Sequence, residues 1–232
     1  GHISDLKGRT VFDKIGIGGI PNAVAKLMEN KKDLGIHTEM LTESMIHLFE
    51  KGAITNRKKT LWPGKFIATF AFGTRRMYSF IEDNPAVFLM RGKYVNDPYV
   101  ISQNEKMVSI NTAITVDLTG QVCSEAIGTR HYSGTGGQLD THRGAAMAKD
   151  GKGIIALRSS AKRGTVSTIL PLLPYGSPVT VPRQDIDYVV TEYGVARLKG
   201  LNVFQRVEAL LAIAHPDFRS DLRKQATEIG LI

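Results

Sequence analysis

The segment GIGGIPNAVAKLMENKKDLGIHTEM, residues 16–40, contains the pattern that decides the fold. Before it, the apolar stretch TVFDKI predicts a strand that runs into the glycine-rich turn. After the turn, Ala23, Leu27 and Met28 recur at helical spacing, and Pro21 suits the first turn of a helix. The apolar LGIHTEM then predicts a second short strand. Strand, glycine loop, helix and strand in this order are typical of a layered α/β fold.

The same alternation continues beyond residue 40. SMIHLFEKG at residues 44–52 predicts a helix closed by Gly52, and FIATFAFG at 66–73 predicts a buried strand that ends in a turn. TRRMYSFIEDNP at 74–85 reads as a helix that stops before Pro85, because a residue that precedes proline avoids the α conformation. We therefore expect helices to flank an open sheet.

The second half of the chain follows the same pattern. MVSINTAITVDL at residues 107–118, GIIALRS at 153–159 and DYVVTEYG at 187–194 predict further strands. HPDFRSDLRKQATEIG at 215–230 predicts a final helix with Asp217 as its N-cap. The fold class that we predict is α/β, an open layered sheet with flanking helices.

The composition sets limits on function and location. The 232 residues are 42% hydrophobic, enough to build a substantial core. No apolar run reaches the length of a membrane span and no secretory signal is visible, so we expect a cytoplasmic protein. The single cysteine, Cys123, excludes a disulfide framework within the chain and is interpreted as a small buried hydrophobic residue.

The charge favours an anionic partner. Thirty Lys and Arg against 22 Asp and Glu give a formal net charge of +8, which suits a phosphorylated cofactor or a nucleic acid. The basic residues are scattered and are not interleaved with aromatic residues that could stack on bases. Nucleic acid is therefore the less favoured partner.

Two stretches concentrate glycine where the chain leaves a predicted strand, GIGGIP at 16–21 and SGTGGQLD at 133–140. Glycine lets the backbone approach a ligand closely, and consecutive amides in such a loop form a concave anion site. Neither stretch completes the dinucleotide fingerprint or a P-loop. A plain tight turn remains an equal interpretation of each stretch alone.

Carboxylates near these turns are candidates for chemistry. Glu39 lies at the end of a predicted strand, where α/β folds present reactive groups, and could act as a nucleophile or a base. Asp117, Glu125 and Glu192 have similar surroundings but are more often caps or hydrogen-bonded turn residues. The six histidines show no metal-ligand spacing, so no metal site is predicted.

Seven ordered motifs resemble those of the acetyl-CoA hydrolase/transferase family, above all 4-hydroxybutyrate and related carboxylate CoA-transferases. The motifs are GIGGIPNAV, KDLGIHTEM, YVNDP, SINTAITVDLTGQV, YSGTGGQLD, DYVVTEYGVARLKG and IAHPDFR. The resemblance implies two similar open α/β domains with the active site at their junction. It covers only the family's C-terminal half, so residues 1–232 are expected to be the C-terminal catalytic domain of a class I CoA-transferase, without the N-terminal domain.

The resemblance also implies roles for individual residues. Glu39 matches the glutamate that forms a glutamyl-CoA thioester, and Glu192 would be a supporting carboxylate. The residues expected to contact coenzyme A are Gly16, Ile17, Gly18, Gly19, Ile20, Asn96, Ser133, Gly136 and Gly137.

The chemistry of these residue types agrees with that role. Attack of a carboxylate on an acyl-CoA gives a mixed anhydride, which the released thiolate can cleave, and backbone amides can stabilise each tetrahedral oxyanion. The expected activity is ping-pong transfer of coenzyme A between an acyl-CoA and a short-chain carboxylate. Coenzyme A is then a substrate, and no tightly bound cofactor is expected.

Two alternatives remain. One is acyl-CoA hydrolysis, in which water resolves the intermediate. The other is an inactive CoA-binding or assembly half that needs an N-terminal partner domain or a second copy of the chain.

Overall fold

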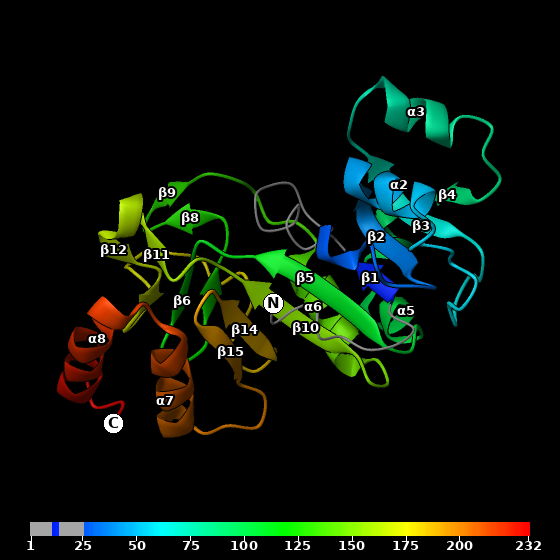
Figure 1. The fold of residues 1–232 in the computed structure, drawn as a ribbon. Helices are drawn as coiled ribbons and strands as arrows, with labels where there is room; N and C mark the ends of the chain where they lie inside the picture. Colours follow the sequence, from blue (N-terminus) through cyan, green and yellow to red (C-terminus); the bar gives the residue numbers. More distant parts are fainter. Residues whose placement is uncertain (1–10, 14–25) are drawn as a thin grey trace. The chain divides into compact units, whose positions relative to one another are not determined.

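The computed structural model of the protein describes residues 11–13 and 26–232, which fall into two compact units. Among the described residues, unit 1 contains 11–13, 26–111 and 140–153, and unit 2 contains 112–139 and 154–232. Both units contain strands and helices (Figure 1). The α/β fold class predicted from the sequence is confirmed.

Unit 1 is built on five parallel strands in the spatial order β5-β1-β2-β3-β4. Their bounds are β1 Val11–Asp13, β2 Gly35–Leu41, β3 Phe66–Ala71, β4 Val87–Leu89 and β5 Met107–Thr112. From β1 the chain adds strands in one direction up to β4 and then places β5 on the other side of β1. In open parallel sheets, ligands bind at the carboxyl ends of the strands near such a reversal of strand order.

The register of these strands divides their residues between two faces. Val11 pairs with Gly35 and with Met107, and His37 pairs with Ile67, so the odd-numbered residues of β1, β2, β3 and β5 share one face. We call this the odd face. Helices α4 (Gly92–Val95), α5 (Pro98–Ser102) and α6 (Gln138–Met147) cover it, because His37 bonds to the end of α4 and Met107 packs with α5 and α6.

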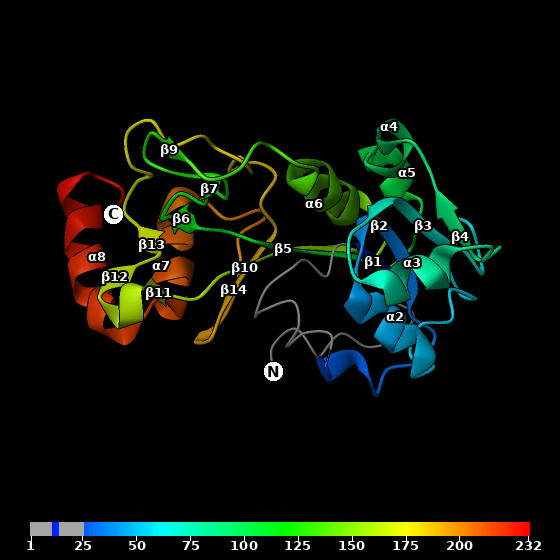
Figure 2. The same ribbon diagram turned by 90° about the horizontal axis from the view of Figure 1, so that it is seen from above.

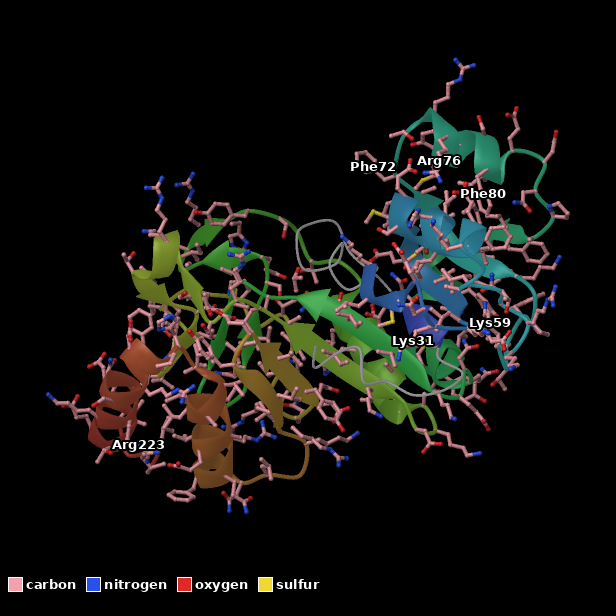
Figure 3. All side chains as sticks on the ribbon, viewed as in Figure 1. Lys31, Lys59, Phe72, Arg76, Phe80 and Arg223 are labelled. Atoms are coloured by element: carbon pink, nitrogen blue, oxygen red, sulfur yellow. The ribbon has the colours of Figure 1, made fainter. Side chains whose placement is uncertain are left out.

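The opposite, even face carries α2 (Glu43–Glu50) and α3 (Arg75–Ile81). The ring of Phe66 contacts Phe49 of α2 at 5.4 Å and Phe80 of α3 at 5.8 Å between centroids. Arg76 forms ion pairs with Glu43 and Glu50 of α2 (Figure 3). In Figure 2, α4 and α5 lie on one side of β1, β2 and β3, and α2 lies on the other.

Unit 2 has a strand set of its own. β10 (Lys152–Ala156) runs parallel to β14 (Tyr188–Thr191), which forms an antiparallel hairpin with β15 (Gly194–Arg197). Helices α7 (Val203–Ile213) and α8 (Pro216–Glu228) lie side by side (Figures 1 and 2). Asn202 and Gln205 form a capping box that starts α7.

Short strands complete unit 2. β13 (Ile169–Leu170), β6 (Thr115–Asp117) and β7 (Val122–Cys123) form a three-stranded sheet, and Cys123 is buried. The two remaining pairs are β8 (Ala126–Ile127) with β9 (Arg130–His131) and β11 (Ser160–Ala161) with β12 (Val166–Ser167), the latter joined through the 3₁₀ helix η1 (Lys162–Gly164).

Two local predictions were wrong. The stretch 107–118 is not one strand but two, β5 and β6, because the chain passes from unit 1 to unit 2 after Asn111. Helix α8 is capped by His215 rather than Asp217, since Pro216 has the fixed φ that suits the first helical position. Asp217 instead lies in the first turn, where a carboxylate complements the helix dipole.

In the part of the chain that the structure describes, none of the helices has the length and apolar character that a membrane crossing requires.

Candidate active site

Glu39 is the fifth residue of β2 and is only partly buried, between the buried Thr38 and the partly buried Met40. By the register it lies on the odd face, two positions after His37. It belongs to the carboxyl-terminal half of its strand, one strand away from β1. The strand thus holds the carboxylate near the ligand-binding edge expected of this topology.

Asn96 and Asp97 form the turn between α4 and α5 on the same face. Asn96 ends α4, and its side-chain Oδ1 is buried without a hydrogen-bond partner among the described residues. Asp97 caps α5 by accepting a bond from the backbone N–H of Tyr99 at 2.8 Å. A buried oxygen without a partner can accept a bond from a ligand at no cost to the protein's own structure.

His37 connects this turn to the strand of Glu39. Its Nε2 donates to the backbone oxygen of Val95, 2.8 Å away, directly before Asn96. Burial lowers the pKa of His37 to about 4, with a further contribution from the charge of Lys59. The imidazole is therefore neutral near pH 7, and the bond to Val95 is made by an uncharged donor.

Asp140, in the first turn of α6, links Glu39 to a third segment. Burial raises the pKa of the Asp140 carboxyl; Arg143 opposes this effect, and the negative charges of Glu39 and Asp97 add to it. Each of these residues belongs to unit 1. Carboxylates of two distant sequence motifs therefore contribute to the raised pKa of Asp140.

The glycine turn Ser133–Gly137 precedes α6 and is held by Glu125. The backbone oxygen of Glu125 accepts bonds from the N–H groups of Tyr132 at 2.7 Å and Ser133 at 3.3 Å. Its buried carboxylate accepts bonds from Thr135 at 3.4 Å and Thr180 at 3.2 Å. Residues 133–136 are exposed and Gly137 is buried, so most of this turn is open to a ligand.

Glu192 lies in the turn between β14 and β15 and is exposed. Its carboxylate accepts bonds from the Ser159 backbone N–H at 2.9 Å and hydroxyl at 2.8 Å. Although burial acts in the other direction, these bonds and the charge of Arg158 lower the pKa of Glu192. The side chain therefore holds a loop of unit 2 in place and is ionised at neutral pH.

The predicted loop Gly16, Ile17, Gly18, Gly19 and Ile20 lies outside the described residues. The described residues contain no group of His, Cys, Asp and Glu side chains that could hold a metal ion.

Sequence reasoning missed several residues around Glu39. Asp140 lay within the quoted SGTGGQLD, and Ser109 and Asn111 within SINTA, yet none of the three was assigned a role. Glu125 was interpreted as a turn residue, and its structural role in holding the glycine turn agrees with that interpretation. Only the packing of α6 reveals Asp140 as a neighbour of Glu39, because the two are a hundred residues apart in the chain.

Comparison with known proteins decides the family. The model of the acetyl-CoA hydrolase/transferase C-terminal domain matches residues 73–226. The chain belongs to this family. The resemblance noted in the sequence motifs is therefore confirmed.

Relatives of this acetyl-CoA hydrolase/transferase chain include characterised transferases. It is 52% identical over 212 residues to 4-hydroxybutyrate coenzyme A transferase of Clostridium kluyveri, covering 91% of the chain and 49% of that protein. It is 48% identical over 232 residues to succinyl-CoA:cyclohexane-1-carboxylate CoA transferase of Geobacter metallireducens, covering 100% and 53%. The chain thus spans about half the length of these relatives.

A solved structure shares the fold. RipA from Yersinia pestis superimposes with a TM-score of 0.90 at 43% identity, over 99% of this chain and 51% of that one.

Proposed function

We propose that this chain is the half of a CoA-transferase that carries the nucleophile, Glu39. A Glu39 oxygen attacks the acyl-CoA carbonyl and the CoA thiolate leaves, giving a mixed anhydride. The thiolate then attacks the glutamyl carbonyl, which releases the donor acid and leaves a glutamyl-CoA thioester. An acceptor carboxylate reverses the two steps and departs as the new acyl-CoA. Splitting the exchange in this way replaces one difficult displacement by easier ones.

The observation that carries the proposal is the strand register, which places Glu39 of β2 level with Asn111 of β5 on the odd face. Asn111 bonds to Thr141, in the first turn of the helix that follows the motif SGTGG. Glu39 is also partly exposed, on the sheet edge where parallel α/β folds bind ligands.

The remaining site residues are assigned as follows. Asn96, with its buried oxygen, and the exposed turn at Ser133 and Gly136, together with Gly137, would contact coenzyme A. The loop Gly16–Ile20 would do the same from the end of β1. Backbone amides of such turns would stabilise the oxyanion by roughly 3 kcal/mol per donor. Glu192 would act as a supporting carboxylate through the Ser159 loop.

The substrate class follows from charge and chemistry. A net charge of +8 favours the phosphates of coenzyme A and small carboxylate acids. Because the chain spans about half of its relatives, we propose that activity requires the N-terminal half that those relatives carry. A cytoplasmic location is part of the same proposal.

The test is chemical trapping of the intermediate. The chain, combined with the N-terminal half of the C. kluyveri relative, is exposed to an acyl-CoA and then to hydroxylamine or borohydride, and its peptides are mapped by mass spectrometry. Modification confined to the peptide that contains Glu39 supports the proposal. Modification of another carboxylate moves the active site elsewhere.

The alternative of acyl-CoA hydrolysis is suggested by the family, which includes hydrolases in its description. Assays with and without acetate separate the two reactions. Release of free coenzyme A that does not depend on added acid indicates hydrolysis, whereas a new thioester that forms only with the acid indicates transfer. Transfer by the chain alone would show that activity does not require the N-terminal half.

A further inference from the structure

Three buried polar side chains form a cluster between β5 and α6 in unit 1. Ser109 and Asn111 lie on the odd face of β5, and Thr141 lies in the first turn of α6; their exposed fractions are 0%, 3% and 1%. The Asn111 amide donates to the Ser109 hydroxyl at 2.9 Å and to the Thr141 hydroxyl at 3.2 Å. The hydroxyls of Ser109 and Thr141 are 3.2 Å apart.

Part of this helix interface is apolar. Met107, Ile101, Ala145 and Ala148 form one buried cluster, and the close approach of α6 to Ile101 is possible because residue 144 is glycine. Thr141 and Ala145 follow at helical spacing on the same side of α6. The buried His142 of α6 lies against Gly153 of β10. Apolar packing therefore contributes to the attachment of α6, and the cluster of Ser109, Asn111 and Thr141 adds directional bonds at its first turn.

That end is the carboxyl end of β5, where the predicted chemistry is located. Burying polar groups disfavours folding unless they are hydrogen-bonded, and these three groups bond to one another. Hydrogen bonds are directional, whereas apolar contacts tolerate sliding. The cluster therefore fixes the height and rotation of the first turn of α6.

The turn that it fixes carries Asp140, adjacent to Thr141 in the chain. Phe12 of β1 pairs with both Ile36 and Val108, so Glu39 and Asn111, three residues further along β2 and β5, lie level with each other on the odd face. Asn111 bonds to Thr141, the neighbour of Asp140. Any movement of this turn changes the distance between Asp140 and Glu39.

We infer that Thr141 is a positioning residue, which together with Ser109 and Asn111 holds the first turn of α6, and with it Asp140, beside the Glu39 carboxylate. The inference rests on the proposed role of Glu39 as nucleophile. Thr141 acts through the helix rather than on the substrate. Its loss should therefore affect the rate of the chemical steps more than substrate binding.

The experiment compares Thr141→Val with Thr141→Ser in the assembled enzyme. Valine has the same shape but no hydroxyl, and serine keeps the hydroxyl. For Thr141→Val we expect kcat and the rate of hydroxylamine-trapped Glu39 modification to fall roughly 10- to 100-fold, as for a nucleophile displaced by a fraction of an ångström to 1 Å. KM should stay within about twofold, and Thr141→Ser should retain kcat within about threefold.

A matched control is Thr55→Val. Thr55 is partly buried and its hydroxyl donates to Asp33 at 3.2 Å, but it lies beside Leu34, at the amino end of β2. This control should lower the melting temperature without changing kcat. If Thr141→Val and Thr55→Val have the same effect on kcat, the inference is overturned.

Two further outcomes keep the test decisive. If Thr141→Val does not fold, Ser109→Ala replaces it: a kcat reduced roughly threefold supports the inference, and an unchanged kcat overturns it. If the wild-type enzyme transfers coenzyme A without modification of Glu39, the proposed function fails. If Glu39 is modified equally fast in the wild type and in Thr141→Val, only the positioning role fails.

Discussion

The two ends of the parallel strands in unit 1 both bury polar groups, but of different chemistry. At the carboxyl end, the neutral cluster of Ser109, Asn111 and Thr141 lies near carboxylates that are partly exposed. At the amino end, the ammonium-bearing Lys59 is 5% exposed and donates to the backbone oxygens of Ile36 at 2.6 Å and Lys65 at 2.7 Å (Figure 3).

The difference shows that a perturbed pKa does not by itself identify a reactive site. Burial lowers the pKa of Lys59 to about 7. Yet the Lys59 amine donates to the backbone oxygens of Ile36, near the start of β2, and of Lys65, directly before β3. These bonds support the loop 56–65. Function is better indicated by side chains from several segments that meet at a partly exposed edge.

The largest effect should follow from Glu39→Gln. Glutamine has nearly the same shape but is not a carboxylate nucleophile, so we expect transferase activity to fall roughly 10,000-fold or more. Glu50→Gln is the control, because Glu50 is an exposed residue of α2 that pairs with Arg76. Steady-state assays of the assembled enzyme measure both variants. If the activity of Glu39→Gln stayed within tenfold of the wild type, Glu39 would not be the nucleophile. The carboxyl end of the strands would then be no more reactive than the amino end.

Much of the fold could be predicted, because it is encoded locally. β2 is shifted by one residue from the predicted LGIHTEM, α2 overlaps SMIHLFEKG and begins one residue before it, and TRRMYSFI contains α3, which starts after Thr74 and ends before Pro85. Each of these segments combines a clear hydrophobic period with a nearby cap or proline. The failure at residues 107–118 has a physical reason as well, since alternation persists while the chain changes from one sheet to another.

The site was less predictable, since its parts meet only through tertiary packing. Glu39 could be proposed from its position and the family resemblance. The neighbours of Glu39 could not, because Asp140 reaches its vicinity through the packing of α6 on β5 and α5. Nor does the sequence indicate that His37 bonds to Val95, directly before Asn96.

The second prediction concerns Lys59 at the amino end. In the unfolded chain the Lys59 amine keeps its proton up to about pH 10.5, whereas in the folded chain it loses the proton near pH 7. Between these pH values the unfolded state therefore binds more protons than the folded state. The free energy of unfolding should therefore rise with pH from about 7 to 10.5, by up to about 5 kcal/mol. Urea titrations at several pH values measure this slope. In Lys59→Met the slope should disappear, whereas Lys58→Met, at an exposed neighbour, should keep it.

The third prediction concerns His37, on the strand between the two ends. Because its pKa is lowered, the His37 imidazole binds a proton near pH 6.5 in the unfolded chain but only near pH 4 in the folded chain. The free energy of unfolding should thus fall by up to about 3 kcal/mol as the pH drops from 6.5 to 4. His37→Gln, which keeps a donor for Val95, should lack this contribution.

The smallest effect is expected from a change in the apolar contacts between α5 and α6. A Cβ at residue 144 would lie 2.6 Å from Ile101 and 3.0 Å from the backbone oxygen of Pro98, so Gly144→Ala forces α6 away from α5. We expect a loss of about 2 kcal/mol in the free energy of unfolding, which thermal or urea denaturation measures. At Gly92 an added Cβ would meet Thr69 at 3.5 Å, an ordinary contact, and Gly92→Ala should be neutral or slightly stabilising. Equal stability of the two variants would mean that apolar packing does not anchor α6, and the polar cluster would then have to hold the helix alone.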